Sequence, residues 1–240
     1  MPATKPQPPV ARALAPGQRR AEIAIAVLFL LTAATSIYGV TVLDPILKAP
    51  DYLARVYPAK GAIAEGALLW SINNIGVVFI AVFAWPLLRR LDETAAIGYL
   101  TARILEGAIM MVGIAATLML IPLSQSYIAH PAPELIAVGD MLQHLKLQGL
   151  TTLSLPLLGL GGLIFVGQLH RFRLVPRAIS AVGLLGYGLV LAGGVASWFD
   201  LLDASPLGPS TFMAIPVALF EIILLPAWLL LKGLNMPARP

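Results

Sequence analysis

A basic and an acidic residue lie three positions apart inside a long apolar stretch of the sequence, GYLTARILEGAIMM (98–111). Arg103 and Glu106 are the only charged residues between Thr94 and Ile121. On a helix this spacing places both side chains on one face, where they can form an ion pair. Ionisable groups are costly in hydrocarbon and usually face the protein interior and a partner. We therefore expect this helix to carry the polar centre of the molecule, with the other apolar segments packed around it.

Polar residues in other apolar segments fall at a similar depth. At 1.5 Å per residue, Arg103 lies about 12 Å and Glu106 about 16 Å from the start of their segment, and half of the hydrocarbon core is about 15 Å. Arg103 is long enough to reach back toward the headgroups, whereas Glu106 is too short. Glu221 precedes Lys232 by eleven residues and is again about 16 Å deep. The candidate ligand-binding residues of this layer are Asn73, Asn74, Arg103, Glu106 and Glu221.

Two interpretations of this polar layer stay open. In the first, a buried network only fixes helix packing, and Arg103 neutralises Glu106 or Glu221. In the second, the layer is a proton- or ion-linked site, because a midplane carboxylate is the usual carrier for such chemistry. Two acids facing one base leave one extra carboxylate. Hydroxyls from a fourth segment lie nearby, on Thr151, Thr152 and Ser154.

The composition indicates an integral membrane protein. The 240 residues are 58% hydrophobic and only 12% charged, with a mean hydropathy of +0.85, whereas soluble domains carry about 25% charge. A soluble fold with so few charges would expose large apolar patches. The absence of cysteine excludes disulfides, thiol catalysis and Cys-ligated metals. The net charge of +4 comes from basic residues at segment ends, so we expect a lipid bilayer and no nucleic acid as partner.

Six apolar segments predict an all-α polytopic membrane protein, a bundle of six transmembrane helices within residues 19–236. The fourth segment is longer than the roughly 20 residues that one straight crossing needs, so its first part is expected to protrude or to line a wet pocket. Residues 122–134 are expected to form a polar turn, and residues 1–18 and 237–240 to form a disordered cytoplasmic tail and a short tail. The predicted spans cover about 23–43, 61–88, 94–121, 139–169, 178–199 and 211–231.

The basic residues predict the orientation of this bundle. With six spans, eleven lysines and arginines fall on the side of the termini and three on the other side. Because positive charge is retained on the cytoplasmic side, both termini are expected in the cytoplasm. The eleven are Lys5, Arg12, Arg19, Arg20, Arg89, Arg90, Arg171, Arg173, Arg177, Lys232 and Arg239, and the three are Lys48, Arg55 and Lys60.

A second, weaker group of candidates lies toward the other side of the membrane. Asp140 and His144 are four residues apart, a spacing that can hold a metal, but Glu65 as a third ligand is only a guess from the sequence. We therefore predict no metal site. The three histidines do not offer two axial ligands at equal depth, so no haem or other cofactor is expected.

Glycine and proline have structural roles in this interpretation. Small residues in the fifth span, among them Gly188 and Gly193, are expected to allow close helix packing. Pro216 and Pro226 each lie five residues from Glu221. Each frees a backbone carbonyl one turn earlier, so the helix around Glu221 carries unsatisfied polarity.

Three stretches carry a resemblance to a known family. GYLTARILEGAIMMVG, FRLVPRAISAVGLLGYGLVLAG and ALFEIILLPAWLLLKGLN resemble the domain-of-unknown-function family 4386 of bacterial membrane proteins, over roughly residues 20–236. The resemblance implies six spans and a bacterial inner membrane, and it implies no activity. The recurring family residues fall on Arg103, Glu106, Arg173, Pro176, Arg177 and Glu221.

The sequence thus predicts a membrane protein that binds or transports a small molecule or ion at a polar midplane site. The alternative is a structural or sensory membrane protein whose buried polar cluster only orders the bundle. No serine elbow, H-E-x-x-H motif or useful aspartate pair is present, so no catalytic residue is predicted and the balance is against an enzyme.

Overall fold

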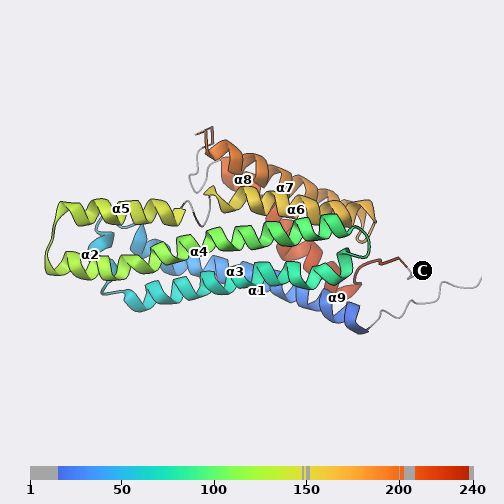
Figure 1. Ribbon diagram of the computed structural model, residues 1–240, viewed down its shortest axis with the longest axis horizontal. Coiled ribbons are helices and arrows are strands. Elements are labelled where there is room, and N and C mark those ends of the chain that lie inside the picture. Colours follow the sequence, from blue (N-terminus) through green and yellow to red (C-terminus); the bar gives the residue numbers. More distant parts are fainter. Residues whose placement is uncertain (1–15, 148, 150–151, 200, 203–208, 238–240) are drawn as a thin grey trace, which may run out of the picture.

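The computed structural model is a bundle of helices (Figure 1), and it describes residues 16–147, 149, 152–199, 201–202 and 209–237. No strand occurs among these residues, so the predicted all-α class is confirmed. The helices are α1 (Pro16–Leu47), α2 (Tyr52–Val56), α3 (Lys60–Leu88), α4 (Glu93–Ala129), α5 (Pro133–Leu147), α6 (Ser154–Arg171), α7 (Arg177–Ser197), α8 (Pro209–Ala218), the π-helical turn η2 (Leu219–Leu224) and α9 (Leu225–Leu231).

Five of the described helical stretches are long and apolar enough to cross a membrane: Gly17–Leu47, Lys60–Leu88, Glu93–Ala129, Arg177–Ser197 and Met213–Leu231. The chain is therefore a multi-pass helical membrane protein. The predicted fourth span, 139–169, is not one continuous helix, because α5 ends at Leu147 and α6 begins at Ser154. A sixth crossing would have to be made by α6, which is not among these five stretches.

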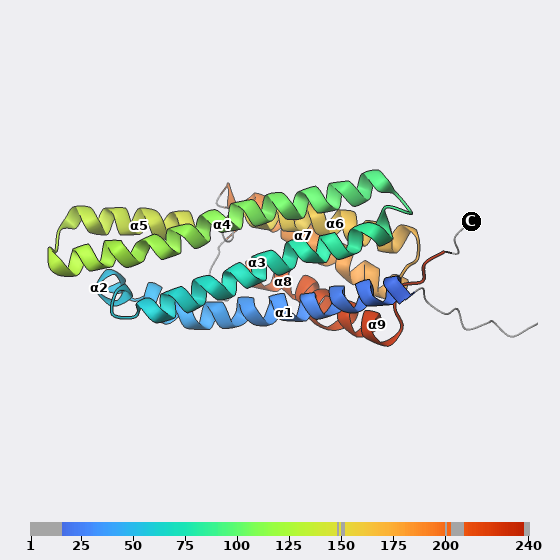
Figure 2. The same ribbon diagram turned by 60° about the horizontal axis from the view of Figure 1, so that its bottom comes forward.

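Helices α5 and α6 follow one another along α4 and run in the opposite direction to it (Figures 1 and 2). Gly149, between them, lies so close to α4 that an added Cβ would stand 2.5 Å from the backbone nitrogen of Gly113. The pair returns the chain to the end where α1 begins. We call this end, with the start of α1 and the finish of α9, the terminal end, and the opposite end, with α2 and the α4–α5 turn, the distal end.

Helix α4 is longer than the sequence predicted. It continues through Pro122 to Ala129, so the predicted polar turn at 122–134 is wrong over most of its length. The reason is tertiary: Ser124 Oγ donates to the carbonyl oxygen of Leu53 (2.5 Å) and accepts from the backbone N–H of Tyr57 (2.8 Å). These two bonds fix α2 against α4 and hold the helix together beyond the proline.

The length of α4 requires part of it to project from the membrane. Its 37 residues span about 55 Å, whereas a core of about 30 Å and a tilt of at most about 40° accommodate only about 26 residues. Asp92 fixes the first turn at the terminal end, where its Oδ1 accepts from Ala95 N (3.0 Å). The excess therefore lies at the distal end, where α2, α5 and the adjoining turns of α1, α3 and α4 share a small apolar core of their own. We call this part the distal lobe; its buried residues include Leu47, Leu53, Val56, Ile63, Leu120 and Leu142.

Glycines bring α6, α7 and α8 into close contact beside the terminal half of α4. A Cβ at Gly162 of α6 would meet the ring of Tyr187 at 2.1 Å, and one at Gly186 of α7 would meet the backbone of Val217 at 2.5 Å. Gly188, which the sequence favoured for packing, has nothing within 4 Å of such an atom, so that prediction is wrong. An added Cβ at Gly193 would come no closer than 3.3 Å to another atom, the Cε of Met213, so this glycine permits no comparably close approach.

The terminal end is closed by contacts between α1 and the residues after α9. The guanidinium of Arg19 donates to the carbonyl oxygens of Leu229 and Leu230, which are left free at the C-terminus of α9. The carboxylate of buried Glu22 accepts a hydrogen bond from the backbone N–H of Leu234 (3.1 Å). The chain turns back toward Glu22 at Gly233, just after α9, with φ of +79°. These contacts join the first and last helices.

Candidate functional site

A cavity of about 350 Å³ lies between α1, α3, α4, α6 and the α8–η2 segment. Four of the five candidate residues of the polar layer line it. They come from three different elements: Asn73 from α3, Arg103 and Glu106 from α4, and Glu221 from η2. Apolar side chains, including Phe29, Ile80, Met110 and Leu158, form much of the remaining wall. We call this space the midplane cavity.

Arg103 and Glu106 form the ion pair that their spacing predicted. Arg103 Nη1 donates to Glu106 Oε2 at 2.9 Å, and the two side chains are only 2% and 5% exposed. The guanidinium also lies 5.4 Å from the ring centre of Tyr99, which stacks on Phe165. Because a buried pair in this geometry neutralises itself, these two residues are mainly a rigid wall of the cavity.

Glu221 is held differently. Its Oε1 lies 4.0 Å from Arg103 Nη2, beyond hydrogen-bond distance, and accepts a hydrogen bond of 2.5 Å from the hydroxyl of Tyr187. Its side chain is 26% exposed, far more than that of Glu106. With both carboxylates ionised, the three charged residues of the cavity sum to one negative charge, and Glu221 is the acid that faces open space.

The backbone around Glu221 is a π-helical turn, which Pro226 explains. The proline has no N–H, and its ring disfavours the usual approach of the carbonyl four residues earlier. The N–H of Leu225 bonds to Phe220 O, five residues back, instead of to Glu221 O. Such turns occur often at functional sites, and this one points the Glu221 side chain into the cavity rather than away from the bundle.

The two asparagines have separate roles. Asn73 lines the cavity, and its amide donates to the backbone carbonyl of Thr32 in α1 (2.8 Å). Asn74 instead faces α4 and donates to the carbonyl of Gly107 (2.9 Å), so it joins α3 to α4 outside the cavity lining. Among the fourth-segment hydroxyls, Ser154 lines the cavity, Thr152 does not, and Thr151 lies outside the described residues.

The cavity lies between α1 and the helical segment formed by α8 and η2. Helix α1 packs against η2 and α9 toward the terminal end, and over the described residues it makes no comparably extensive contact with α8. Ala33 and Ile37 of α1 and Ala214 and Ile222 on the opposite side line the cavity at this position. Small and apolar groups therefore border the side of the cavity between α1 and α8.

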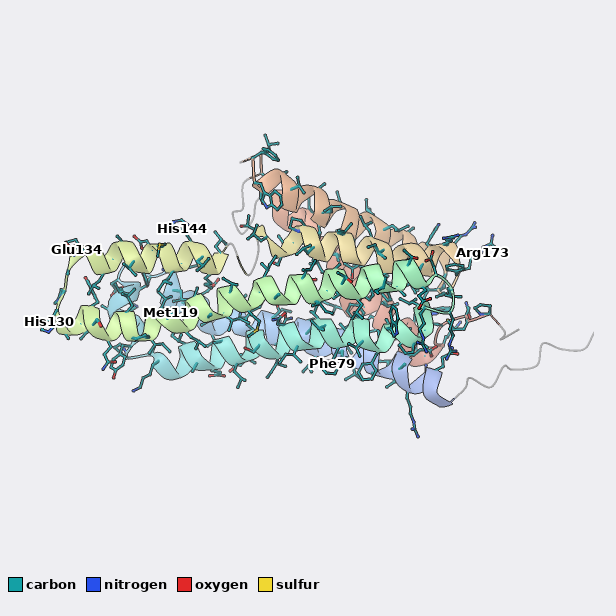
Figure 3. All side chains as sticks on the ribbon, in the orientation of Figure 1. Phe79, Met119, His130, Glu134, His144 and Arg173 are labelled. Carbon is teal, nitrogen blue, oxygen red and sulfur yellow. The ribbon has the colours of Figure 1, made fainter. Side chains whose placement is uncertain are left out.

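The second group of candidates, in the distal lobe, does not form one site. Asp140 Oδ1 accepts from the hydroxyl of Tyr52 (2.8 Å), whereas His144 is exposed on α5 (Figure 3) and lines a different cavity. Burial, reinforced by the bond to Asp140, raises the pKa of Tyr52 well above its ordinary range, so its hydroxyl stays a donor. Glu65 is exposed on α3. No group of three metal-ligating side chains occurs in the part of the chain that the structure describes.

Sequence reasoning missed Tyr187 and Tyr99. Both are almost completely buried, at 0% and 1% exposure, and both contact the charged residues of the cavity. In the sequence each is one aromatic residue among many apolar ones, and no spacing relates Tyr187 in α7 to Glu221 in η2. The family motif turn that contains Arg173 lies at the terminal end (Figure 3), and Arg173 does not line the cavity. Its backbone is left-handed, with φ of +52°.

A family model described as Domain of unknown function (DUF4386) matches residues 24–233. The match begins within the third turn of α1 and runs past the end of α9, so it includes every described residue that lines the midplane cavity. No curated protein and no solved structure matches the chain.

Proposed function

The chain belongs to the family Domain of unknown function (DUF4386), and because that membership carries no activity, we propose a function from the geometry alone: the midplane cavity binds a small molecule that carries one cationic group. Glu221 is the residue that recognises the cation. The remaining wall of the cavity accommodates the apolar part of the ligand.

The observation that carries this proposal is the excess acid in the cavity. Glu106 has its own base, Arg103, at 2.9 Å, whereas Glu221 lies 4.0 Å from the same arginine and keeps a quarter of its side chain exposed. Among the described residues, only Tyr187 donates a hydrogen bond to Glu221. A cationic group beside Glu221 would complete the charge balance of the cavity, and charge in hydrocarbon is stable only when it is paired.

The size and the lining agree with a small organic ligand. Pockets for such ligands measure about 300–1,000 Å³ and are mostly apolar with a few polar groups, and the midplane cavity measures about 350 Å³. Phe29 and Trp70 belong to its lining, and aromatic faces attract cations. A bare metal ion would find only two carboxylates here, one of which is already paired.

We place the protein in the cytoplasmic membrane of a bacterium, with both termini in the cytoplasm. The terminal end carries most of the basic residues, and the distal end carries Lys48, Arg55, Lys60 and Lys146. The positive-inside rule supports this orientation. The ligand would then be held between a cytoplasmic terminal end and a distal lobe on the outer side.

The test is ligand-dependent stability of the purified protein in detergent. Small aralkylammonium ions, with the isosteric neutral alcohols as controls, are titrated while unfolding is followed. A ligand at 100 times its dissociation constant stabilises by about 2.7 kcal/mol, and we expect this effect for the amines and not for the alcohols. Glu221→Gln should abolish it, whereas Glu93→Gln, an exposed acid at the start of α4, should retain it.

The structural alternative predicts a different result. If no amine stabilises the wild type, and Glu221→Gln unfolds at the same temperature with and without amines, the polar layer only orders the bundle. The buried pair of Arg103 and Glu106 would be sufficient for that role.

A further inference from the structure

A second cavity, of about 460 Å³, lies between the distal end of α1 and the last turns of α5. It shares Trp70 with the midplane cavity but none of the other residues. Its wall has two parts. One is apolar and includes Val40, Leu43 and Leu47. The other is polar and consists of Asp44, Lys48, Gln143, His144 and Lys146. We call this space the distal cavity.

The charges of the distal cavity leave one cation in excess. Lys48 Nζ lies 2.5 Å from Asp44 Oδ2, so these two residues neutralise each other. Lys146 is half-buried and forms no hydrogen bond or close ion pair with any described residue, and the carboxylate that attracts it is Asp44, which is already paired with Lys48. Gln143 uses its amide to donate to the carbonyl of Leu47 (3.1 Å) and so ties α5 to the end of α1. With His144 neutral, the polar wall carries a net charge of +1.

The position of this wall is that of lipid headgroups. Asp44 and Lys48 follow directly after the apolar run of α1, which the sequence ends at Leu43. Charged residues at the end of such a run mark the boundary of the hydrocarbon. Val40 and Leu43 therefore lie on the acyl side of Asp44, and Lys146 lines the same cavity from α5.

We propose that the distal cavity binds the acid head of a membrane amphiphile, a carboxylate or a phosphate, against Lys146, with the first part of its apolar chain along Val40, Leu43 and Trp70. The site is separate from the midplane cavity and does not depend on the function proposed for it. An anion balances the net positive charge of the polar wall, and an attached chain covers the apolar wall. A soluble anion without a chain would leave that wall in contact with water.

Trp70 provides the measurement, because its side chain lines the cavity. Bromine atoms on an acyl chain quench an indole only on contact. The protein is reconstituted in bilayer discs of phosphatidylcholine that contain a small fraction of brominated phosphatidic acid or, in the matched control, the same fraction of brominated phosphatidylcholine. The signal of Trp70 is the difference between the wild type and Trp70→Phe, which removes the contribution of the other three tryptophans.

We expect the anionic probe to quench Trp70 at a mole fraction at least ten times lower than the zwitterionic probe. Lys146→Gln should remove this difference. Asp44→Asn should enlarge it, since it frees Lys48 and raises the net charge of the wall from +1 to +2. A gain of binding cannot result from misfolding. Lys60→Gln, which removes a lysine at the start of α3 outside the cavity lining, should change nothing.

A further experiment distinguishes a phosphate lipid from a free fatty acid as the ligand. A brominated fatty acid is added to discs of plain phosphatidylcholine, with its methyl ester as the neutral control. Quenching by the phosphatidic acid identifies a phosphate lipid as the ligand, and quenching by the fatty acid alone identifies a free carboxylate. Equal quenching by charged and neutral probes overturns the proposal, as does an effect of Lys60→Gln as large as that of Lys146→Gln.

Discussion

The stability of the polar layer should depend unequally on its two acids. Glu106 lies 2.9 Å from Arg103 with both side chains almost fully buried, whereas Glu221 lies 4.0 Å from the arginine and is 26% exposed. Coulomb attraction falls with the inverse of distance, so the second contact has about 0.7 times the strength of the first before solvent weakens it further. The second contact also lacks a hydrogen bond.

Breaking a buried pair costs about 3–5 kcal/mol, because one charge is left uncompensated. Glu106→Gln should lower the free energy of unfolding by the smaller amount, about 3 kcal/mol, because Glu221 remains to compensate Arg103. Arg103→Gln should lower the free energy of unfolding by the larger amount, about 5 kcal/mol, because it leaves two acids without a base. Glu221→Gln should cost less than about 1 kcal/mol, because the amide oxygen still accepts from Tyr187.

The assay is reversible unfolding in mixed micelles, with the free energy extrapolated to zero denaturing detergent. The double variant of Arg103 and Glu106 should lose less than the sum of the single losses, with a coupling of about 2–3 kcal/mol. The corresponding coupling of Arg103 with Glu221 should be below about 1 kcal/mol. Additive losses for the first pair, or equal couplings for the two pairs, would refute the assignment of Glu106 as the structural partner and Glu221 as the available acid.

Two further predictions concern topology and packing. A compartment-specific reporter inserted at His130, in the α4–α5 turn, and one fused after Lys232 should report opposite sides of the membrane, the second cytoplasmic; identical reports would exclude the proposed orientation. Gly162→Ala should destabilise by about 1–3 kcal/mol, because the buried Tyr187 ring cannot retreat from the added Cβ. Gly188→Ala, where the added Cβ meets no atom within 4 Å, should instead stabilise the helix by about 0.5–1 kcal/mol. The same unfolding assay measures both variants, and a loss of stability in Gly188→Ala as large as that in Gly162→Ala would contradict this description of the packing.

The fold class and much of the candidate site follow from local rules. Arg103 and Glu106 meet because a spacing of three fixes their common face, and Glu221 reaches their level because helical rise converts sequence separation into depth. Asn73 and Asn74 were predicted together, but adjacent residues on a helix point about 100° apart, so only Asn73 lines the cavity.

The features that the sequence did not predict are those that depend on other helices. Helix α4 passes through Pro122 because Ser124 bonds to α2, a contact between residues far apart in the chain. The close-packing glycines are Gly162 and Gly186 rather than Gly188, since the choice depends on the rotation of each helix in the bundle. Tyr187 of α7 donates a hydrogen bond to Glu221 of η2, and no local sequence pattern indicates a bond between these two helices.

Among the residues that the structure describes, Trp70 alone lines both cavities. Its indole also packs against α1, where an added Cβ at Gly39 would lie 3.1 Å from both Cδ1 and Nε1. A single rigid ring therefore belongs to the wall of both cavities. If the ligands proposed for the two cavities displace this ring, each changes the free energy of binding of the other, and thermodynamic linkage makes the two effects equal in size.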